Sequence, residues 1–372
     1  MMDFDDLDEV AAAAVEAGDE EARLAMGVVE PPEPWNGYSM RPLKRSIKVP
    51  SREHLPEKVQ NTLKERTVEL YSMRLFVMYG GGDSFVMWSP TLNLLPDTLE
   101  VAIHEYPGHG IRDEEPHPKD QNELSNDVWD AFKPILSEHA KGGKHEGAPF
   151  ALLGHSQGVL QMVDVAEKMR VELGIRPCAV FAFDRPPPGP MGLSQYGYDL
   201  LTQPWMDEFY CSNGQDALGK MLRDQKDQPR VQKIGYMWQN DMRISNEAFT
   251  QRPVGFHTFR CDVLVFMAEA NWMGDAYMEK AFAEGTVSPE QKARWEKQCK
   301  IQGSKPDSTS YFDRDAYKLW EKWTLGKTHY HNINCGHNDL KADPSAWKIV
   351  LNVLNQHIEA EKTRIAAEKR GS

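Results

Sequence analysis

Short apolar runs rich in β-branched and aromatic residues recur along the chain, and longer amphipathic or polar stretches separate them. Six of these runs predict strands, namely Leu75–Tyr79, Leu99–His104, Phe150–Leu153, Cys178–Phe183, Val263–Met267 and Thr328–Ile333. Residues 159–171 have apolar positions at helical spacing, and Gly174 follows them as a typical helix stop. Near-continuous apolar strands that alternate with helices predict an α/β fold, with a mostly parallel central sheet and helices on both faces.

Two intervals between the predicted strands are too long to be plain crossovers. Residues 190–258 follow a proline-rich stretch and are rich in Met and aromatic residues, so we interpret them as a helical lid inserted into the fold. The second interval, about residues 272–326, has charged helical patterns and is interpreted as a surface insertion. The predicted α/β core then consists of residues 74–189 and 259–372.

The charge of the chain is uneven. Its 372 residues include 43 Lys and Arg against 56 Asp and Glu, a formal net charge of −13. Residues 1–34 contain eleven of the acids and one base, and this like charge together with several prolines predicts a disordered leader. Residues 35–73 form a basic lead-in segment. An acidic chain of this kind has little affinity for a phosphate backbone, so nucleic acid is not an expected partner.

Neither a membrane span nor a bound metal is expected. No stretch reaches 18 uninterrupted apolar residues, which argues against a membrane span. Five Cys residues without paired spacing, and an N-terminus without a basic and apolar signal segment, favour a reducing, cytoplasmic location. His329, His331 and Cys335 offer metal-ligand chemistry, but no further ligand lies at a useful spacing, so we expect neither a metal nor another cofactor.

The strongest chemical signal is the segment Gly154-His155-Ser156-Gln157-Gly158, which lies between a predicted strand and a predicted helix. This is the G-x-S-x-G pattern in the strand–turn–helix context of a nucleophile elbow. The flanking glycines permit the sharp turn that raises the Ser156 hydroxyl above the sheet, and the helix N-terminus favours an adjacent oxyanion. Ser156 is therefore the predicted nucleophile. The alternative is an ordinary strand–helix turn capped by a serine.

A serine nucleophile needs a base, and His337 is the best candidate. It follows the last predicted strand and a glycine, where the chain order Ser, acid, His places it. The second requirement is an oxyanion hole. Because glycines follow the first predicted strand, we expect the backbone amides of Tyr79 and Gln157 to be its donors, with Gly80 and Gly81 close to the substrate.

The segment from Tyr106 to Pro116, Y-P-G-H-G-I-R-D-E-E-P, resembles the P-G-R-G-x-R-x-x-E-P signature of type II thioesterases. These are the stand-alone α/β-hydrolases that serve polyketide and non-ribosomal peptide synthases. The glycine run after the first strand, Phe85, Trp88, the elbow and the Gly336-His337 pair occur in the same order. The resemblance implies an α/β-hydrolase fold and a serine thioesterase. Its substrates would be acyl groups on the phosphopantetheine arm of an acyl carrier protein, or acyl-CoA.

The third member of the triad departs from that family. The family has a G-D-x-D type segment after the fifth predicted strand, but this sequence has Ala268-Glu269-Ala270-Asn271, so Asn271 occupies the usual acid position. Asp184 ends the preceding predicted strand, and integral thioesterase domains of the same synthases resemble that arrangement. We therefore predict Asp184 as the acid. Glu269 is the alternative, and Asp275 lies in the same loop.

The elbow and triad do not distinguish a sulfur from an oxygen leaving group. A carboxylesterase or lipase acting on oxygen esters, and an acyl transferase or cyclase on the same fold, are therefore alternatives. A non-catalytic scaffold that binds a carrier protein is supported only by Asn271. In the predicted lid, Met191, Tyr196 and Trp205 are expected to contact an apolar acyl chain, although such residues equally suit packing within the lid itself.

Overall fold

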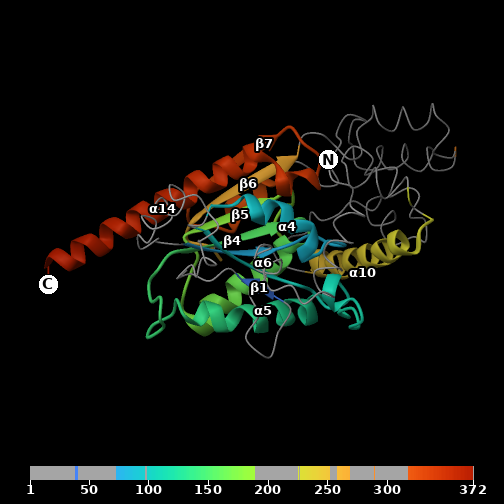
Figure 1. The fold of residues 1–372 in the computed structure, drawn as a ribbon, viewed down its shortest axis with the longest axis horizontal. Coiled ribbons are helices and arrows are strands. Elements are labelled where there is room, and N and C mark those ends of the chain that lie inside the picture. The colour runs from blue at the N-terminus through green and yellow to red at the C-terminus, as the bar shows by residue number, and fades with distance from the viewer. Residues whose placement is uncertain are drawn as a thin grey trace, which may run out of the picture.

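The computed structural model describes residues 38–40, 73–96, 99–188, 225, 227–251, 258–268, 289 and 317–371. The described residues form one seven-stranded sheet in the order β1-β3-β2-β4-β5-β6-β7. Its strands are β1 (Tyr38–Met40), β2 (Met73–Met78), β3 (Leu99–His104), β4 (Phe150–His155), β5 (Ala179–Phe183), β6 (Asp262–Ala268) and β7 (Thr328–Ile333). Figure 1 shows β4 to β7 lying side by side in the order in which they occur in the sequence.

The predicted α/β fold is confirmed. The six predicted strands are all present, and they pair in parallel from β3 through β2, β4, β5 and β6 to β7. The bounds of β3 and β7 are those predicted, and the other strands differ by one or two residues at an end. The strand that the sequence did not predict is β1, which lies in the lead-in segment and pairs antiparallel with β3, Ser39 opposite Ile103.

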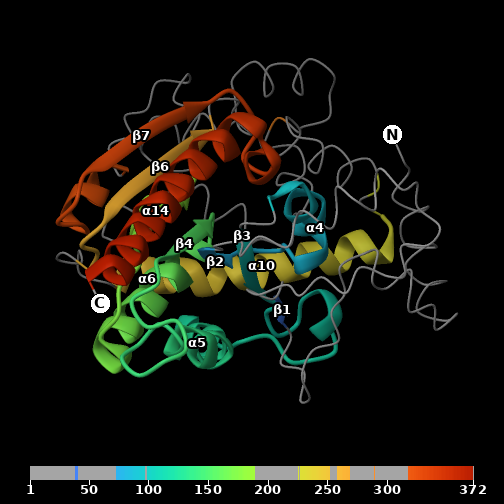
Figure 2. The ribbon, with the colours of Figure 1, turned by 60° about the vertical axis from the view of Figure 1, so that its left-hand side comes forward.

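Helices cover both faces of this sheet. The longer ones are α4 (Phe85–Leu94), α5 (Gln121–Ser137), α6 (Gly158–Lys168), α10 (Pro229–Gln251) and α14 (Pro344–Gly371). Figure 2 shows α5 and α6 together on one side and α4 and α14 on the other. The short turns are η2 (Gly110–Arg112), η3 (Met169–Leu173), η4 (Lys318–Lys322) and η5 (Asp339–Ala342). The predicted helix stop is confirmed, because η3 continues α6 and ends at Gly174, whose φ is +68°.

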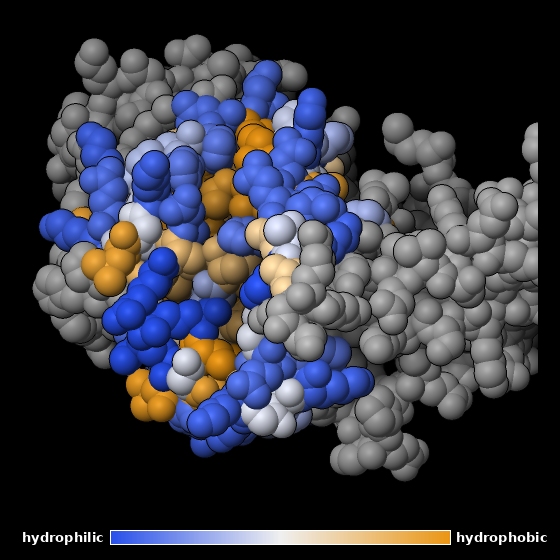
Figure 3. Space-filling view, turned by 90° about the vertical axis from the view of Figure 1, so that its left-hand side faces the viewer, coloured by the Kyte–Doolittle hydropathy of each residue, from blue (hydrophilic) through white to orange (hydrophobic). Residues whose placement is uncertain are grey.

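The core lies between the sheet and its helices. Every residue of β2, β3, β4 and β5 is buried, which explains why their sequences are continuous apolar runs and do not alternate. Hydrophilic side chains make up most of the described surface on the face shown in Figure 3, with hydrophobic ones in small areas between them. In the part of the chain that the structure describes, no helix combines the length and the apolar character needed to cross a membrane.

Several predicted features lie outside the described residues. Among them are the acidic leader, the lid residues Met191, Tyr196 and Trp205, and the alternative acid Glu269. Of the predicted lid insertion, the largest described part is α10, which contacts α5.

Candidate active site

Ser156 lies at the turn between β4 and α6, at the carboxyl end of the parallel strands. Its φ is +51°, a left-handed value that is uncommon for a residue with a Cβ. Its backbone N–H donates to the carbonyl of Phe183 at 2.8 Å, which fixes the turn against β5. Ser156 is 6% exposed, so its side chain reaches the surface only narrowly. This is the geometry of a nucleophile elbow.

The glycines of the elbow are required by close backbone contacts. A Cβ on Gly158 would lie 2.0 Å from the carbonyl oxygen of Met78, and one on Gly154 would lie 2.7 Å from the Cα of Val159. These neighbours are backbone atoms of β2 and α6, which cannot move aside as a side chain can. The two glycines therefore permit α6 to begin directly against the sheet.

We expect Gly158→Ala to lower the free energy of unfolding by about 3 kcal/mol or more, because overpacking against a rigid strand displaces backbone. Urea unfolding followed by circular dichroism measures this change. Gly147→Ala is the control, because a Cβ there would meet no atom within 4 Å, and the only penalty is backbone strain at its φ of +73°, a positive value that Gly158 does not have. Strain alone should then cost about 1 kcal/mol. Equal losses in the two variants would contradict the role assigned to the Gly158 contact.

The structure brings His337 and Asp184 together from distant segments. His337 follows β7 and Asp184 follows β5, and Nδ1 of His337 lies 2.7 Å from Oδ2 of Asp184. Both residues are buried, at 3% and 6% exposure. With Nδ1–H donating to the carboxylate, the other ring nitrogen, Nε2, is left as the basic atom.

The carboxylate of Asp184 is held on both oxygens. While Oδ2 faces His337, Oδ1 accepts from the Ala268 amide at 3.1 Å and from the Tyr317 hydroxyl at 3.0 Å. Asp184 has a φ of +48°, and it and Ser156 are the two non-glycine residues with positive φ in the described ranges. Backbone strain of this kind is concentrated at functional sites, where the surrounding structure must maintain it.

His155, next to the nucleophile, supports the histidine loop. Its Nε2 lies 3.1 Å from the carbonyl oxygen of His337, so Nε2 must donate the hydrogen bond. Complete burial, together with the charges of His337 and Lys341, holds the pKa of His155 well below its ordinary value. His155 is therefore a neutral residue that positions the backbone of His337, and its ring packs 5.0 Å from the His337 ring, centroid to centroid.

The loop after β2 lies against the nucleophile. A Cβ on Gly80 would come within 3.0 Å of the Ser156 Cβ, so this backbone approaches the serine as closely as packing permits. Gly80 follows Tyr79, one of the predicted oxyanion donors. The other, Gln157, is fully buried at the start of α6. The structure thus brings the segments of both predicted donors to Ser156, and the individual amide hydrogen bonds to an oxyanion stay a prediction.

The same loop is anchored to the histidine loop through Asp83. One oxygen of its carboxylate accepts from Lys341 Nζ at 2.7 Å and from the Trp88 indole N–H at 3.0 Å. Lys341 belongs to η5, four residues after His337. The ion pair therefore joins the loop after β2 to the loop that contains His337, and its burial makes it costly to break by removing one partner.

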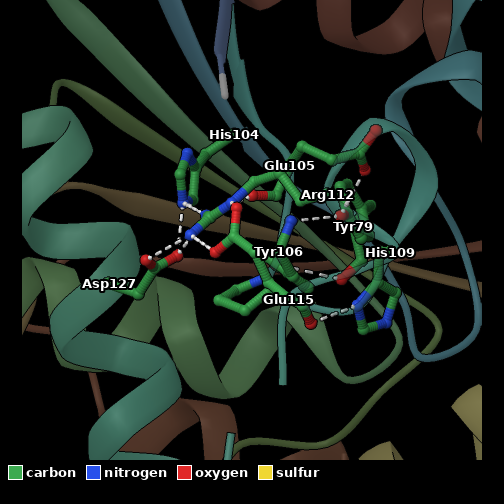
Figure 4. A network of polar contacts seen from close by, with 9 residues as sticks. Tyr79, His104, Glu105, Tyr106, His109, Arg112, Glu115 and Asp127 are labelled. Carbon is green, nitrogen blue, oxygen red and sulfur yellow. Dashed lines mark hydrogen bonds and ion pairs between the residues drawn. The ribbon is translucent and has the colours of Figure 1, made fainter. Parts of the chain in front are cut away.

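The segment that resembles the thioesterase signature forms a polar network beside the loop after β2 (Figure 4). Arg112 is its centre: the guanidinium contacts both oxygens of Asp127 and of Glu115, and it donates to the Glu105 carbonyl at 2.8 Å. The Glu105 side chain accepts from the Tyr79 hydroxyl at 2.6 Å. Burial raises the pKa of Glu105. The signature thus stabilises the strand end from which the loop after β2 begins.

Among the residues that the structure describes, no cluster of three or more His, Cys, Asp or Glu side chains could hold a metal ion. His329 contacts Asp262 at 3.1 Å. The sequence did not reveal three supporting residues of the site, namely His155, Tyr317 and Lys341. No sequence motif indicates which residue each of them contacts, because the contacting residue lies in a distant segment of the chain.

Comparisons with known proteins agree with this architecture. No protein-family model matches the chain. Among curated proteins, the gramicidin S biosynthesis protein GrsT of Aneurinibacillus migulanus is 27% identical over 146 residues, 38% of this chain and 52% of that protein. The chain thus spans about half the length of the curated relative that it matches.

Two solved structures extend the comparison to most of the fold. The RedJ thioesterase of the prodiginine pathway in Streptomyces coelicolor is 18% identical with a TM-score of 0.52, covering 76% of this chain and 89% of RedJ. ClbQ from the colibactin NRPS/PKS pathway is 17% identical with a TM-score of 0.50, covering 78% of this chain and 99% of ClbQ. At this sequence identity, the likeness establishes a shared fold and no more.

Proposed function

We propose that the protein is a serine thioesterase that hydrolyses acyl thioesters, with acyl groups on a phosphopantetheine carrier protein as its substrates. The observation that supports this most directly is the convergence of Ser156, His337 and Asp184 at the carboxyl edge of the sheet. The fold shared with the RedJ thioesterase favours a thioester over an oxygen ester, and the partial identity with GrsT, a gramicidin S biosynthesis protein, fits a role in such biosynthesis. The signature segment at residues 106–116 adds to this argument.

In the first half-reaction the Ser156 hydroxyl attacks the thioester carbonyl, and His337 Nε2 takes the hydroxyl proton. Asp184 holds the imidazole through Nδ1 and stabilises the cation that forms. The amides of Tyr79 and Gln157 donate to the tetrahedral oxyanion. The carbon–sulfur bond then breaks, and the thiolate leaves with the proton that His337 returns. An acyl group remains on Ser156.

In the second half-reaction water attacks the acyl ester while His337 removes its proton. The same amides bind the second oxyanion, and the Ser156 oxygen leaves as it regains a proton from His337. The products are a carboxylic acid and the original enzyme. No cofactor is needed, because the proton moves between groups that the chain itself supplies.

The experiment compares three substrates that share one acyl group: the acyl carrier protein thioester, the acyl-CoA thioester and the p-nitrophenyl oxygen ester. Thiol release is followed with a thiol-reactive dye and p-nitrophenol by absorbance. We expect kcat/KM for the carrier thioester to exceed that for the oxygen ester at least tenfold. A preference for the oxygen ester would indicate a carboxylesterase, and acyl transfer to an added alcohol or amine in place of hydrolysis would indicate a transferase.

A further inference from the structure

Asp241 is a fully buried aspartate in the middle of α10, the described helix of the predicted lid insertion. Its Oδ2 accepts from the Gly82 backbone N–H at 2.7 Å and lies 2.8 Å from His109 Nε2. Gly82 belongs to the loop after β2 that lies against Ser156. A carboxylate from the lid helix therefore binds directly to the backbone of the loop that contains the predicted oxyanion donor Tyr79.

The same residue also contacts the other side of the predicted oxyanion hole. The side chain of Gln157 donates from Nε2 to the backbone carbonyl of Asp241 at 3.1 Å. Gln157 is the second predicted donor, so one residue of α10 links the segments of both donors. Trp238, one turn earlier on α10, packs so closely on Gly82 that a Cβ there would lie 2.4 Å from its ring. Hydrogen bonds and close van der Waals packing thus both join α10 to the loop after β2.

The hydrogen bonds of His109 define its charge. Nε2 faces the Asp241 carboxylate, and Nδ1 lies 3.0 Å from the carbonyl oxygen of Pro107. Both partners are oxygen atoms that only accept, so both ring nitrogens must donate, and His109 is an imidazolium. His109 and Asp241 then form an ion pair whose side chains are both 0% exposed.

Several titratable and charged groups surround this imidazolium. They are Asp241 on α10, Glu105, Tyr106 and His117 on the segment after β3, and Tyr79 at the end of β2. Burial alone would lower the pKa of His109, but the charge and hydrogen bond of Asp241, together with the Pro107 carbonyl and the charge of Glu105, outweigh burial and raise it. The ion pair is therefore present below the ordinary histidine value of about 6.5 and is lost as the pH rises through the raised pKa.

We propose that Asp241 is a positioning residue of the oxyanion hole, which ties the loop after β2 and the start of α6 to α10. Asp241 does not contact the reacting atoms. It acts through Gly82 and Gln157, so the two amides reach their working geometry when α10 is docked on the ion pair with His109. This inference rests on the proposed function, because it assigns a role within the same site.

The test distinguishes a positioning role from a loss of stability by measuring both the fraction of molecules with a reactive Ser156 and the rate constant of those molecules. An alkyl fluorophosphonate labels a serine nucleophile and leaves a tetrahedral adduct whose oxygen occupies the oxyanion hole. Intact mass gives the fraction of molecules labelled at Ser156, and the time course gives the rate constant for those molecules. For Asp241→Ala we expect a loss of about 30- to 100-fold in this rate constant and in kcat, with KM within about threefold of wild type.

Asp241→Asn is the conservative variant. It keeps an oxygen that can accept from Gly82 but lacks the charge that pairs with His109, so we expect a loss of about tenfold. Asp164→Asn is the matched control, because Asp164 is also a buried aspartate, 7% exposed. Its carboxylate accepts hydrogen bonds from Ser125 and Gln121, neither of which belongs to the loop after β2. Its rate constant should stay within about threefold of wild type.

The pH profile tests the ion pair. His109→Gln cannot titrate, so the ratio of the wild-type labelling rate to the His109→Gln rate should fall as the pH rises from 6 to 9. A ratio that does not change with pH would contradict the assigned charge. Asp241 variants that lower the labelled fraction, but keep the wild-type rate constant for each labelled site, would overturn the positioning role. Absence of labelling at Ser156 in the wild type would instead overturn the proposed function.

Discussion

Ser156→Ala is expected to lower kcat/KM for the carrier thioester by about 10⁴-fold or more, because the variant has no atom that can form the acyl-enzyme. Ser156 projects from an elbow with a φ of +51°, and the replacement changes only the hydroxyl. Initial rates of thiol release and intact mass after incubation with substrate measure the effect. The acyl adduct seen on the wild-type chain should be missing from the variant.

The control is Ser125→Ala. Ser125 is a buried serine whose hydroxyl contacts Asp164 on α6 and takes no part in the candidate site. It should cost stability but little activity for each folded molecule. If Ser156→Ala keeps more than a tenth of the wild-type turnover, with an adduct on another residue, then Ser156 is not the nucleophile.

Asp184→Asn is expected to reduce kcat by about 10³- to 10⁴-fold, with a much smaller change in KM. An amide in place of the carboxylate cannot stabilise the imidazolium of His337, and its NH₂ group favours the wrong histidine tautomer. Stopped-time assays with high enzyme concentration measure so large a loss. The unfolding temperature of the variant should remain high enough that the protein is folded during the assay.

Two further variants test the role of Asp184 independently. Tyr317→Phe removes one of the hydrogen bonds to Oδ1 of Asp184 while the amide of Ala268 remains, so we expect a loss of about tenfold. Glu269→Gln tests the alternative acid from the sequence. A large loss for Glu269→Gln with a small one for Asp184→Asn would assign the acid to Glu269, and the contact between Asp184 and His337 would then be structural only.

The strands β2 to β5 were predictable because burial on both faces imposes a local signal. A strand covered by helices on each side must be apolar at consecutive positions, and β2 to β5 show this directly. By contrast β1 has three residues, Tyr38–Met40, and forms through pairing with β3. A segment so short has no periodicity to detect, which is why the sequence did not predict it.

The elbow was likewise predictable from residues that are neighbours in the sequence. Gly154, Ser156 and Gly158 lie within five residues, and both glycines are required by close contact with the backbone at the end of β2 and at the start of α6. The acid was not local. Sequence alone left Asp184, Glu269 and Asp275 as candidates, since all three follow predicted strands or lie in the loop after one. The catalytic assignment of Asp184 stays a prediction, now supported by its 2.7 Å contact with His337.

The sequence by itself determined the α/β class, six strands, the elbow and the histidine candidate, because each depends on residues that are neighbours along the chain. The tertiary structure decided which carboxylate faces His337, that His155 contacts the backbone of His337, and that Asp241 of α10 binds the loop after β2. Those pairs are separated by 153, 182 and 159 residues. The first two pairs form because the parallel strands bring their carboxyl ends to one edge, and the third forms because α10 docks on the loop at that edge; only the folded chain has either arrangement.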